Sequence, residues 1–272
     1  MYILGNIGGT KTRIGISKNL KKIDKIFLYS TPKFYKEFLE LISKFLHIGK
    51  VGNLKASCFG FAGVFDKKKE RLIFAPNLKD YENKNLKNDL EKILNCKVYL
   101  ENDAILEALE EANFGAGKKF KIFGYVTLGT GIGGAKVVNF KIDENYFGFE
   151  PGHSLFLIQD KDKIIPIEVE EVLGGKSIER AIGKNPKDIK DEKFWINYSK
   201  ILALFLINIS LLWSIEGIIL GGSLTKSVNF KVLKKEFNRF YPFSIKPKIL
   251  KAKIKKSKGL YGALLFLKDK LS

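Results

Sequence analysis

The feature that most restricts the fold is a glycine-rich turn between two short strands, found near the start of each half of the chain. In the first half, GNIGGTK separates strand-like runs at 2–4 and 12–17. In the second half, LGTGIGG separates IFGYVTL, 122–128, from AKVVNFKI, 135–142. Because runs of this kind bounded by glycine are typical of strands, each half is predicted to begin with a glycine hairpin. The likeness of the two halves is a weak internal repeat.

The rest of the chain reads as alternating strands and helices. Apolar residues at helical spacing predict helices, and short apolar runs ending at turn residues predict strands. The break FGAGKK after residue 113 predicts a boundary between two domains. We expect an N-terminal lobe, 1–115, completed by a C-terminal helix, 259–272, and a larger lobe, 116–258. Helices are predicted at 33–47, 85–95, 104–114, 170–181, 195–213 and 260–271, and further strands at 25–30, 56–63, 97–103 and 217–220.

Composition restricts the partners and the location. The chain has 272 residues, 48 Lys and Arg and a formal charge of +19, which would suit a nucleic-acid partner. However, the basic residues run throughout the chain without an aromatic-basic repeat, so we expect a Lys-rich surface and no nucleic acid. Cys58 and Cys96 lie in apolar segments, and no signal sequence precedes the first strand, which predicts a cytoplasmic protein without disulfides.

One stretch has the length of a membrane span. Residues 201–220, ILALFLINISLLWSIEGIIL, are almost all apolar. Asn208 and Ser210 lie inside this stretch, Glu216 interrupts it and two glycines end it. We therefore predict a buried helix to about Trp213 followed by a short strand, and no membrane partner.

The second glycine turn resembles a dinucleotide-binding loop only in its spacing. Gly129, Gly131 and Gly134 fit the pattern G-x-G-x-x-G. That motif requires a helix to open at the glycines so that the pyrophosphate meets its N-terminus. Here the alternating, β-branched run AKVVNFKI follows, and no phosphate-binding P-loop motif occurs anywhere in the chain.

Two glycine hairpins instead suggest two anion-binding turns. Glycines allow the backbone to approach a ligand closely, and exposed N–H groups can form an anion-binding nest. Thr10, Lys11 and Thr130 would add donors. One hairpin in each half could close on the phosphates of a nucleotide from both sides, although either hairpin alone could be a plain turn. The predicted nucleotide-binding residues of the two turns are Gly8, Gly9, Thr10, Lys11, Gly129, Thr130, Gly131 and Gly133.

A set of short motifs in fixed order then resembles one family. The chain is similar to sugar kinases of the ROK family (repressors, open reading frames, kinases), within the hexokinase–actin superfamily. The resemblance implies an α/β fold of the two-lobed, ribonuclease H-like, actin/hexokinase type, with mixed sheets flanked by helices. The matching segments are GNIGGTKTRIGI (5–16), FGFAG (59–63), APNL (75–78), VYLENDAILEALEEANFGAG (98–117), TLGTGIGGA (127–135), GFEPGH (148–153), EEVLGG (170–175), IILGGSL (218–224) and LYGALL (260–265).

Asp103 is the candidate catalytic residue. It stands where a strand gives way to a helix, so its carboxylate could take a proton from a sugar hydroxyl that attacks the γ-phosphate. Asp is also a common helix cap, which is the alternative from the residues alone. The resemblance implies that Asp103 is the catalytic base and that Asn102 binds sugar hydroxyls.

The remaining candidates rest mainly on the resemblance. Glu150 and His153, in GFEPGH, could bind hydroxyls, or could belong to an exposed turn. The resemblance implies that both contact the sugar, as do Asn77 and Glu170, although Glu171 next to Glu170 leaves that assignment open by one position. Gly221 and Gly222 resemble the turn that leaves room for adenine and ribose, or are a simple turn at the start of a helix.

Two departures from the family bear on metals. The resemblance implies ATP with Mg²⁺, but Asn6 stands where most members have an acid thought to support the Mg–nucleotide complex. We therefore expect activity that needs more Mg²⁺. Many members also bind zinc through a histidine and downstream cysteines, whereas residues 154–170 contain no cysteine. Because a zinc site needs about four ligands, we expect no zinc and name no metal ligands.

The leading hypothesis is ATP-dependent phosphorylation of a hexose at its 6-hydroxyl, as in a glucokinase. An N-acetylhexosamine, mannose or fructose kinase of the same family is the alternative within the class. A catalytically silent sugar-binding protein, suggested by Asn6, and a DNA-binding regulator are alternatives from other classes. Regulators of the family add an N-terminal helix-turn-helix, whereas here a strand begins at Tyr2, and the basic segment 246–258 alternates like a strand with a solvated face. The resemblance also suggests a homodimer.

Overall fold

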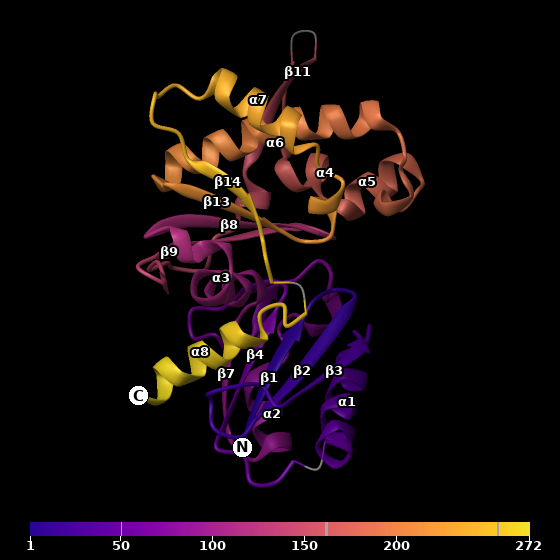
Figure 1. The fold of residues 1–272 in the computed structure, drawn as a ribbon. Coiled ribbons are helices and arrows are strands. Elements are labelled where there is room, and N and C mark those ends of the chain that lie inside the picture. The colour runs from indigo at the N-terminus through magenta and orange to yellow at the C-terminus, as the bar shows by residue number, and fades with distance from the viewer. Residues whose placement is uncertain (50, 161–162, 255) are drawn as a thin grey trace. The chain divides into compact units, whose positions relative to one another are not determined.

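The computed structural model describes residues 1–49, 51–160, 163–254 and 256–272, which form two compact units (Figure 1). Unit 1 contains residues 1–113, 144–148 and 254–272, and unit 2 contains residues 114–143 and 149–253. We expected residues 254–258 to belong with the second unit. The described residues of this segment belong to unit 1, where the buried Glu111 accepts a hydrogen bond from the backbone of Ile254 at 2.6 Å and the buried Glu110 accepts one from the side chain of Ser257.

Unit 1 is built on a five-stranded mixed sheet in the order β3-β2-β1-β4-β7. The antiparallel part is β1, β2 and β3, and β1, β4 and β7 run parallel to one another. The first glycine turn joins β1 to β2, so the first predicted hairpin is confirmed. The strands are β1 (Tyr2–Ile7), β2 (Lys11–Ser17), β3 (Lys25–Ser30), β4 (Ala56–Phe61) and β7 (Lys97–Asn102).

Helices pack against this sheet through apolar faces. In α1 (Tyr35–Ile48) the buried residues Tyr35, Phe38, Ile42 and Phe45 recur at helical spacing, and α2 (Leu86–Leu94) lies beside α1. The C-terminal helix α8 (Leu260–Leu271) packs on β1, β2 and β4. The fourth helix, α3 (Asp103–Phe114), follows β7 directly. The aromatic core of unit 1 is therefore supplied mainly by α1 and by β4.

Unit 2 repeats the plan with a second five-stranded mixed sheet, in the order β10-β9-β8-β13-β14. Strand β8 is antiparallel to β9 and parallel to β13, which is parallel to β14. The second glycine turn joins β8 to β9, as predicted, but the second strand ends at Val138 because Asn139 and Phe140 turn the chain with positive φ. The strands are β8 (Ile122–Leu128), β9 (Ile132–Val138), β10 (Lys141–Ile142), β13 (Gly217–Gly221) and β14 (Lys248–Lys251).

The long helix α6 (Glu192–Trp213) forms the centre of the core of unit 2. It packs against β8, β13 and α7 (Phe230–Phe240), and it ends at Trp213 as predicted. It is the one described helix long and apolar enough to cross a membrane, and 56% of its most apolar window is buried inside the fold. The predicted helix 170–181 is instead two short helices, α4 (Val169–Leu173) and α5 (Gly175–Ile182), because Gly174 adopts an extended conformation.

Two small hairpins were not predicted from the sequence. In unit 1, β5 (Val64–Phe65) pairs with β6 (Leu72–Phe74). In unit 2, β11 (Leu155–Asp160) pairs with β12 (Lys163–Glu168). Single-turn 3-10 helices complete the elements at η1 (Lys79–Tyr81), η2 (Ala116–Lys119), η3 (Pro151–His153), η4 (Pro186–Asp188) and η5 (Leu224–Lys226). Two mixed five-stranded sheets flanked by helices confirm the predicted α/β fold class.

Candidate functional site

The three parallel strands of unit 1 end side by side, and this edge carries most of its predicted site residues. Ile7, at the end of β1, pairs with Phe61, and Phe61 pairs with Asn102 at the end of β7. The segments that follow these strands are the first glycine turn, the turn at Gly63 and the start of α3. In sheets of this kind, ligands bind at the carboxyl ends of parallel strands.

The first glycine turn is tight and exposed. Gly8 N donates to the carbonyl oxygen of Lys11 at 3.1 Å, and the side chain of Thr31 donates to the carbonyl of Gly8 at 2.7 Å. Residues 9–11 are exposed to solvent. Asn77 lies against the turn, since a Cβ at Gly9 would come within 2.7 Å of the Asn77 Cβ. The structure therefore brings Gly8, Gly9, Thr10, Lys11 and Asn77 together.

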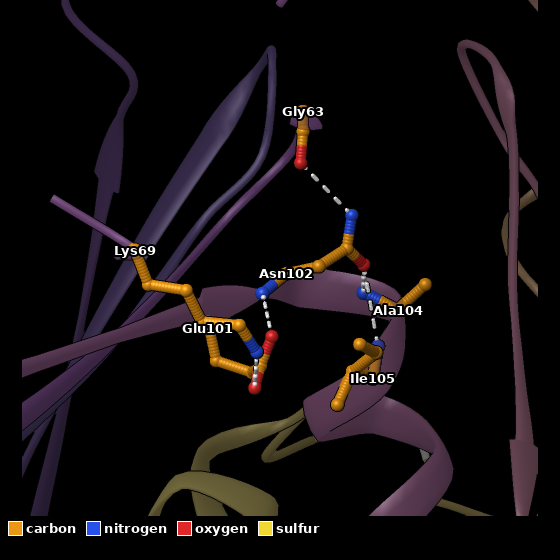
Figure 2. Close-up of polar contacts among 6 residues, drawn as sticks. All are labelled: Gly63, Lys69, Glu101, Asn102, Ala104 and Ile105. Carbon is orange, nitrogen blue, oxygen red and sulfur yellow. Dashed lines mark hydrogen bonds and ion pairs between the residues drawn. The ribbon is translucent and has the colours of Figure 1, made fainter. Parts of the chain in front are cut away.

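Asn102, rather than Asp103, caps α3 with its side chain (Figure 2). Its Oδ1 accepts hydrogen bonds from the backbone of Ala104 at 2.8 Å and of Ile105 at 3.3 Å. Its Nδ2 donates to the carbonyl of Gly63 at 3.1 Å. These three bonds use most of the hydrogen-bonding capacity of the amide. The second hydrogen on Nδ2 takes part in none of them.

Asp103 is the first residue of α3 and is half-buried at the edge where β1, β4 and β7 end. One of its oxygens, Oδ1, accepts from the backbone of Ala104 at 2.9 Å. Because Asn102 performs the main capping role, capping alone does not account for Asp103, whose carboxylate has the chemistry of a general base.

The second glycine turn, in unit 2, is bound to the start of α5. The backbone N–H of Gly129 donates to the carbonyl of Gly131 at 3.0 Å. The backbone N–H of Gly175 donates to the carbonyl of Gly129 at 2.9 Å. Lys176 N donates to the carbonyl of Thr130, also at 2.9 Å. Gly133 lies within β9, opposite Thr127, and not in the turn itself.

Gly221 and Gly222 lie beside the end of β8, where the second glycine turn begins. Gly221 pairs with Thr127 across the sheet. Gly222 has φ of +83°, and a Cβ there would overlap the backbone of Leu128. Only glycine fits this conformation and this close approach. The structure thus places both glycines beside the turn that contains Gly129 and Thr130.

Two acidic candidates, Glu150 and Glu170, lie around Ile132, next to the second turn. Glu170 Oε2 accepts from the backbone of Ile132 at 2.5 Å, and Glu150 directly precedes η3, whose Gly152 lies against the carbonyl of Ile132. Glu171 pairs instead with Arg180 at the surface, so Glu170 is the residue that faces the turn.

The charges in this group influence one another. Burial raises the pKa of the Glu150 carboxyl to about 7; the nearby His153 acts to lower it and Glu170 acts to raise it further. The ring of His153 pairs through Nδ1 with Oε2 of Glu168 at 2.8 Å. Glu150 therefore changes charge near neutral pH. A ligand that is bound by the carboxylate would bind more weakly once this group is protonated.

The predicted residues thus form two groups. Asn77, Asn102, Asp103 and the first glycine turn belong to unit 1, whereas Glu150, His153, Glu170, Gly221, Gly222 and the second glycine turn belong to unit 2. Within each unit the structure brings the members to one region.

Metal ligands are scarce around the first turn. Asn6 is buried, and its Nδ2 donates to the carbonyl of Lys258 at 2.5 Å, so this position offers Mg²⁺ no carboxylate. In the part of the chain that the structure describes, no three His, Cys, Asp or Glu side chains form a cluster that could hold a metal ion. The absence of a zinc site stays a prediction.

Comparison with known proteins gives relatives of the whole chain and of its parts. A glucokinase of Streptomyces coelicolor is 32% identical over 151 residues, which are 54% of this chain and 47% of that enzyme, so the match spans about half of the relative. An N-acetyl-D-glucosamine kinase of Histophilus somni is 30% identical over 98% of this chain and 99% of its own length. A xylose repressor of Caldicellulosiruptor bescii is 32% identical over 37% of this chain and 26% of the repressor.

Solved structures share the fold over their full length. The ROK hexokinase of Thermus thermophilus superposes with a TM-score of 0.81, at 21% identity, over 100% of this chain and 99% of that one. A ROK family glucokinase of Streptomyces griseus, solved with glucose and AMPPNP, gives a TM-score of 0.78 at 23% identity, over 97% of this chain and 98% of that one. The ROK family pattern itself matches residues 3–270, and the chain therefore belongs to the ROK family.

Proposed function

We propose that this protein is an ATP-dependent hexose kinase that phosphorylates the 6-hydroxyl of its sugar. The observation that supports it best is the position of Asp103, at the first turn of α3 and at the same sheet edge as the exposed glycine turn. A base and a phosphate-binding turn at one edge are what phosphoryl transfer from a nucleotide requires.

In the proposed reaction, the 6-oxygen of the sugar attacks the γ-phosphorus of ATP. The new O–P bond forms as the bond between the γ-phosphorus and the β,γ-bridging oxygen breaks, and ADP leaves. The hydroxyl proton passes to the Asp103 carboxylate, for which general-base help is worth about 10²–10⁴-fold. Backbone N–H groups of the two glycine turns bind phosphate oxygens in this proposal.

Mg²⁺ would neutralise charge on the phosphates when bound with ATP. Asn6 supplies no carboxylate for it, so we derive no step through the metal. Sugar hydroxyls would be bound by Glu150, His153 and Glu170, with Asn77 and the remaining Nδ2 hydrogen of Asn102. The relatives support a hexose or an N-acetylhexosamine as substrate, and our preference is glucose, with N-acetylhexosamine, mannose and fructose as alternatives.

A coupled assay of ADP release over glucose, mannose, fructose and N-acetylhexosamines tests the proposal. We expect turnover with at least one sugar and a loss of at least about 100-fold in kcat in Asp103→Asn. Asp188→Asn, at an exposed position of unit 2, is the matched control and should keep full activity. If no sugar exceeds background, or if Asp103→Asn equals the wild type, the proposed function is wrong.

Two observations favour other classes. Asn6 in place of an acid would suit a sugar-binding protein without catalysis, which calorimetry would reveal as sugar binding without ADP release. The repressor relative and the charge of +19 would suit a DNA-binding regulator, which a salt-dependent gel shift on duplex DNA would reveal. A homodimer remains a prediction from the family resemblance, and a cytoplasmic location remains a prediction from the cysteine pattern.

A further inference from the structure

We propose that an ion pair between Lys69 and Glu101 holds the turn that presents Asp103, so that both are positioning residues for phosphoryl transfer. The inference rests on the proposed kinase function and adds residues to it that the sequence did not single out. Lys69 lies on the β5–β6 hairpin, 32 residues before its partner.

Glu101 is a charged group inside unit 1. Only 4% of the residue is exposed, and its Oε2 pairs with Nζ of Lys69 (Figure 2). Its other oxygen, Oε1, accepts a hydrogen bond from the backbone N–H of Asn102 at 2.9 Å. A buried carboxylate is costly unless it is paired and hydrogen-bonded, and both conditions are met here. One oxygen is thus fixed by Lys69 while the other fixes the backbone next to Asp103.

The contacts continue from Glu101 into the helix. Asn102, held at its backbone by Glu101, binds the backbone of Ala104 and Ile105 with its side-chain oxygen and the carbonyl of Gly63 with its nitrogen. Asp103, the first residue of α3, lies between Asn102 and Ala104, which these bonds hold. A shift of the Glu101 carboxylate would therefore be passed to Asp103 through the backbone that it holds.

Lys69 adopts a backbone conformation that glycine adopts more easily. Its φ is +51°, in the left-handed region, and its N–H donates to the carbonyl of Asp66 at 2.9 Å. The Asp66 side chain closes the same turn by accepting from the backbone of Glu70 at 2.7 Å. A non-glycine residue at positive φ is uncommon, and such a conformation persists where surrounding contacts hold it. Here the side chain reaches the Glu101 carboxylate.

The exposures of the two side chains indicate which partner depends on the other. The Lys69 side chain is 39% exposed and that of Glu101 is 5% exposed. Without Lys69, the carboxylate would remain buried without its counter-charge, and it would move toward water or take up a proton. Either response disturbs the bond to Asn102. Displacing a reacting group by about 1 Å can cost about 100-fold in rate.

The test compares Lys69→Met with Lys69→Arg and with Lys68→Met. Methionine keeps the apolar stem and removes the charge, arginine restores the charge, and Lys68 is an exposed lysine in the same turn. We expect Lys69→Met to lower kcat about 10- to 100-fold, with the KM values for sugar and ATP within about twofold of the wild type. Lys69→Arg should recover most of kcat, and Lys68→Met should match the wild type.

A second variant tests the coupling. Glu101→Gln removes the buried charge but keeps an oxygen that can accept from Asn102. In this background, Lys69→Met should lower kcat by less than about twofold, because the charge that Lys69 compensates is absent.

Hydrogen exchange provides a readout that does not need activity. We expect Lys69→Met to lose amide protection at residues 102–105 and to keep it elsewhere in the sheet. The proposal is overturned if protection there is unchanged, if Lys69→Met keeps the wild-type kcat, or if Lys69→Arg is as impaired as Lys69→Met. A wild-type chain inactive on every sugar would overturn the kinase function instead, and protection at 102–105 would still decide whether Lys69 holds this turn.

Discussion

The side-chain amide of Asn6 donates a hydrogen bond to the carbonyl oxygen of Lys258 at 2.5 Å, although 252 residues separate the two in sequence. Asn6 lies near the end of β1, and Lys258 precedes the C-terminal helix α8. Both Lys258 and Gly259 have positive φ, so the chain turns sharply at this point. A carboxylate at position 6 could not donate this bond, which gives Asn6 a structural role in this protein.

We predict that Asn6→Asp destabilises the protein. The carboxylate would face a carbonyl oxygen in a buried site, and the cost of such a loss is about 1–3 kcal/mol or more for a charged group. Urea denaturation at pH 7 measures the change in the free energy of unfolding. Asn19→Asp is the control, because Asn19 is exposed and its side chain only accepts a hydrogen bond. An Asn6→Asp variant as stable as the wild type would contradict the structural role.

The same variant tests the expectation about magnesium. If Asn6 limits the support of the Mg–nucleotide complex, Asn6→Asp should reach half-maximal activity at a lower Mg²⁺ concentration than the wild type. Mg²⁺ titrations of kcat at saturating ATP and sugar measure this. An unchanged Mg²⁺ optimum in correctly folded Asn6→Asp would mean that position 6 does not support the metal.

Glu150 should make sugar use depend on pH. Its pKa is raised to about 7, chiefly by burial, so the carboxylate is increasingly protonated as the pH falls below 7. A neutral carboxyl accepts fewer hydrogen bonds from hydroxyls, and kcat/KM for sugar should fall toward tenfold per pH unit well below that pKa. This fall is the acidic limb of the pH profile of kcat/KM. Measured from pH 5 to 9, the limb should be absent in Glu150→Gln.

Glu170 provides an internal check on that interpretation. Its charge helps to raise the pKa of Glu150, so Glu170→Gln should move the limb to lower pH. A limb that stays in place in both variants would belong to another group.

Much of this fold follows from local patterns, and the ion pairs do not. The strand at 97–102 followed by a helix is evident because the sequence changes from a short apolar run to helical spacing at Asp103. Asn102 is itself a favoured N-cap residue, so the sequence also signals the cap, a role considered above only as the alternative for Asp103. Lys69 gave no such signal, because its partner Glu101 is remote in sequence and its strands have only two and three residues.

The hairpin β11–β12 was missed for a different reason. KIIPIE is rich in β-branched residues, but Pro166 within the run weakens its signal as a strand. The tertiary bonds that assign residues 254–258 to unit 1 come from the buried Glu110 and Glu111, whose partners the sequence pattern cannot identify.

Glu110 should make stability depend on pH. It is 1% exposed, and burial raises its pKa to about 7, while donors from Ser257 and the backbone of Gly259 act to lower it and Glu107 raises it further. The folded state therefore holds this proton more tightly than the unfolded state. The stabilisation is complete below the unfolded pKa of about 4.5 and is lost as the pH rises through about 7.

Glu110→Gln should flatten this dependence. From the size of the pKa shift, the stability of the wild type relative to the variant should fall by about 3 kcal/mol between pH 4.5 and pH 8. Urea denaturation at several pH values measures the difference. Glu216→Gln, at an exposed position where the side chain accepts only backbone donors, is the control. A constant difference between wild type and Glu110→Gln would show that folding does not raise the pKa of Glu110.

Gly131 has no room for a side chain. A Cβ there would collide with the carboxylate of Glu170, which binds the backbone of Ile132 at 2.5 Å. Gly131→Ala should therefore push Glu170 from its place and raise KM for sugar at least about tenfold, the expected loss for a hydrogen bond to a charged group. Gly129→Ala is the matched comparison in the same turn, because its Cβ would lie 3.9 Å from the nearest atom. Sugar titrations should show weakened binding only for Gly131→Ala, and equal sugar affinity in both variants would mean that Glu170 does not bind the sugar from this position.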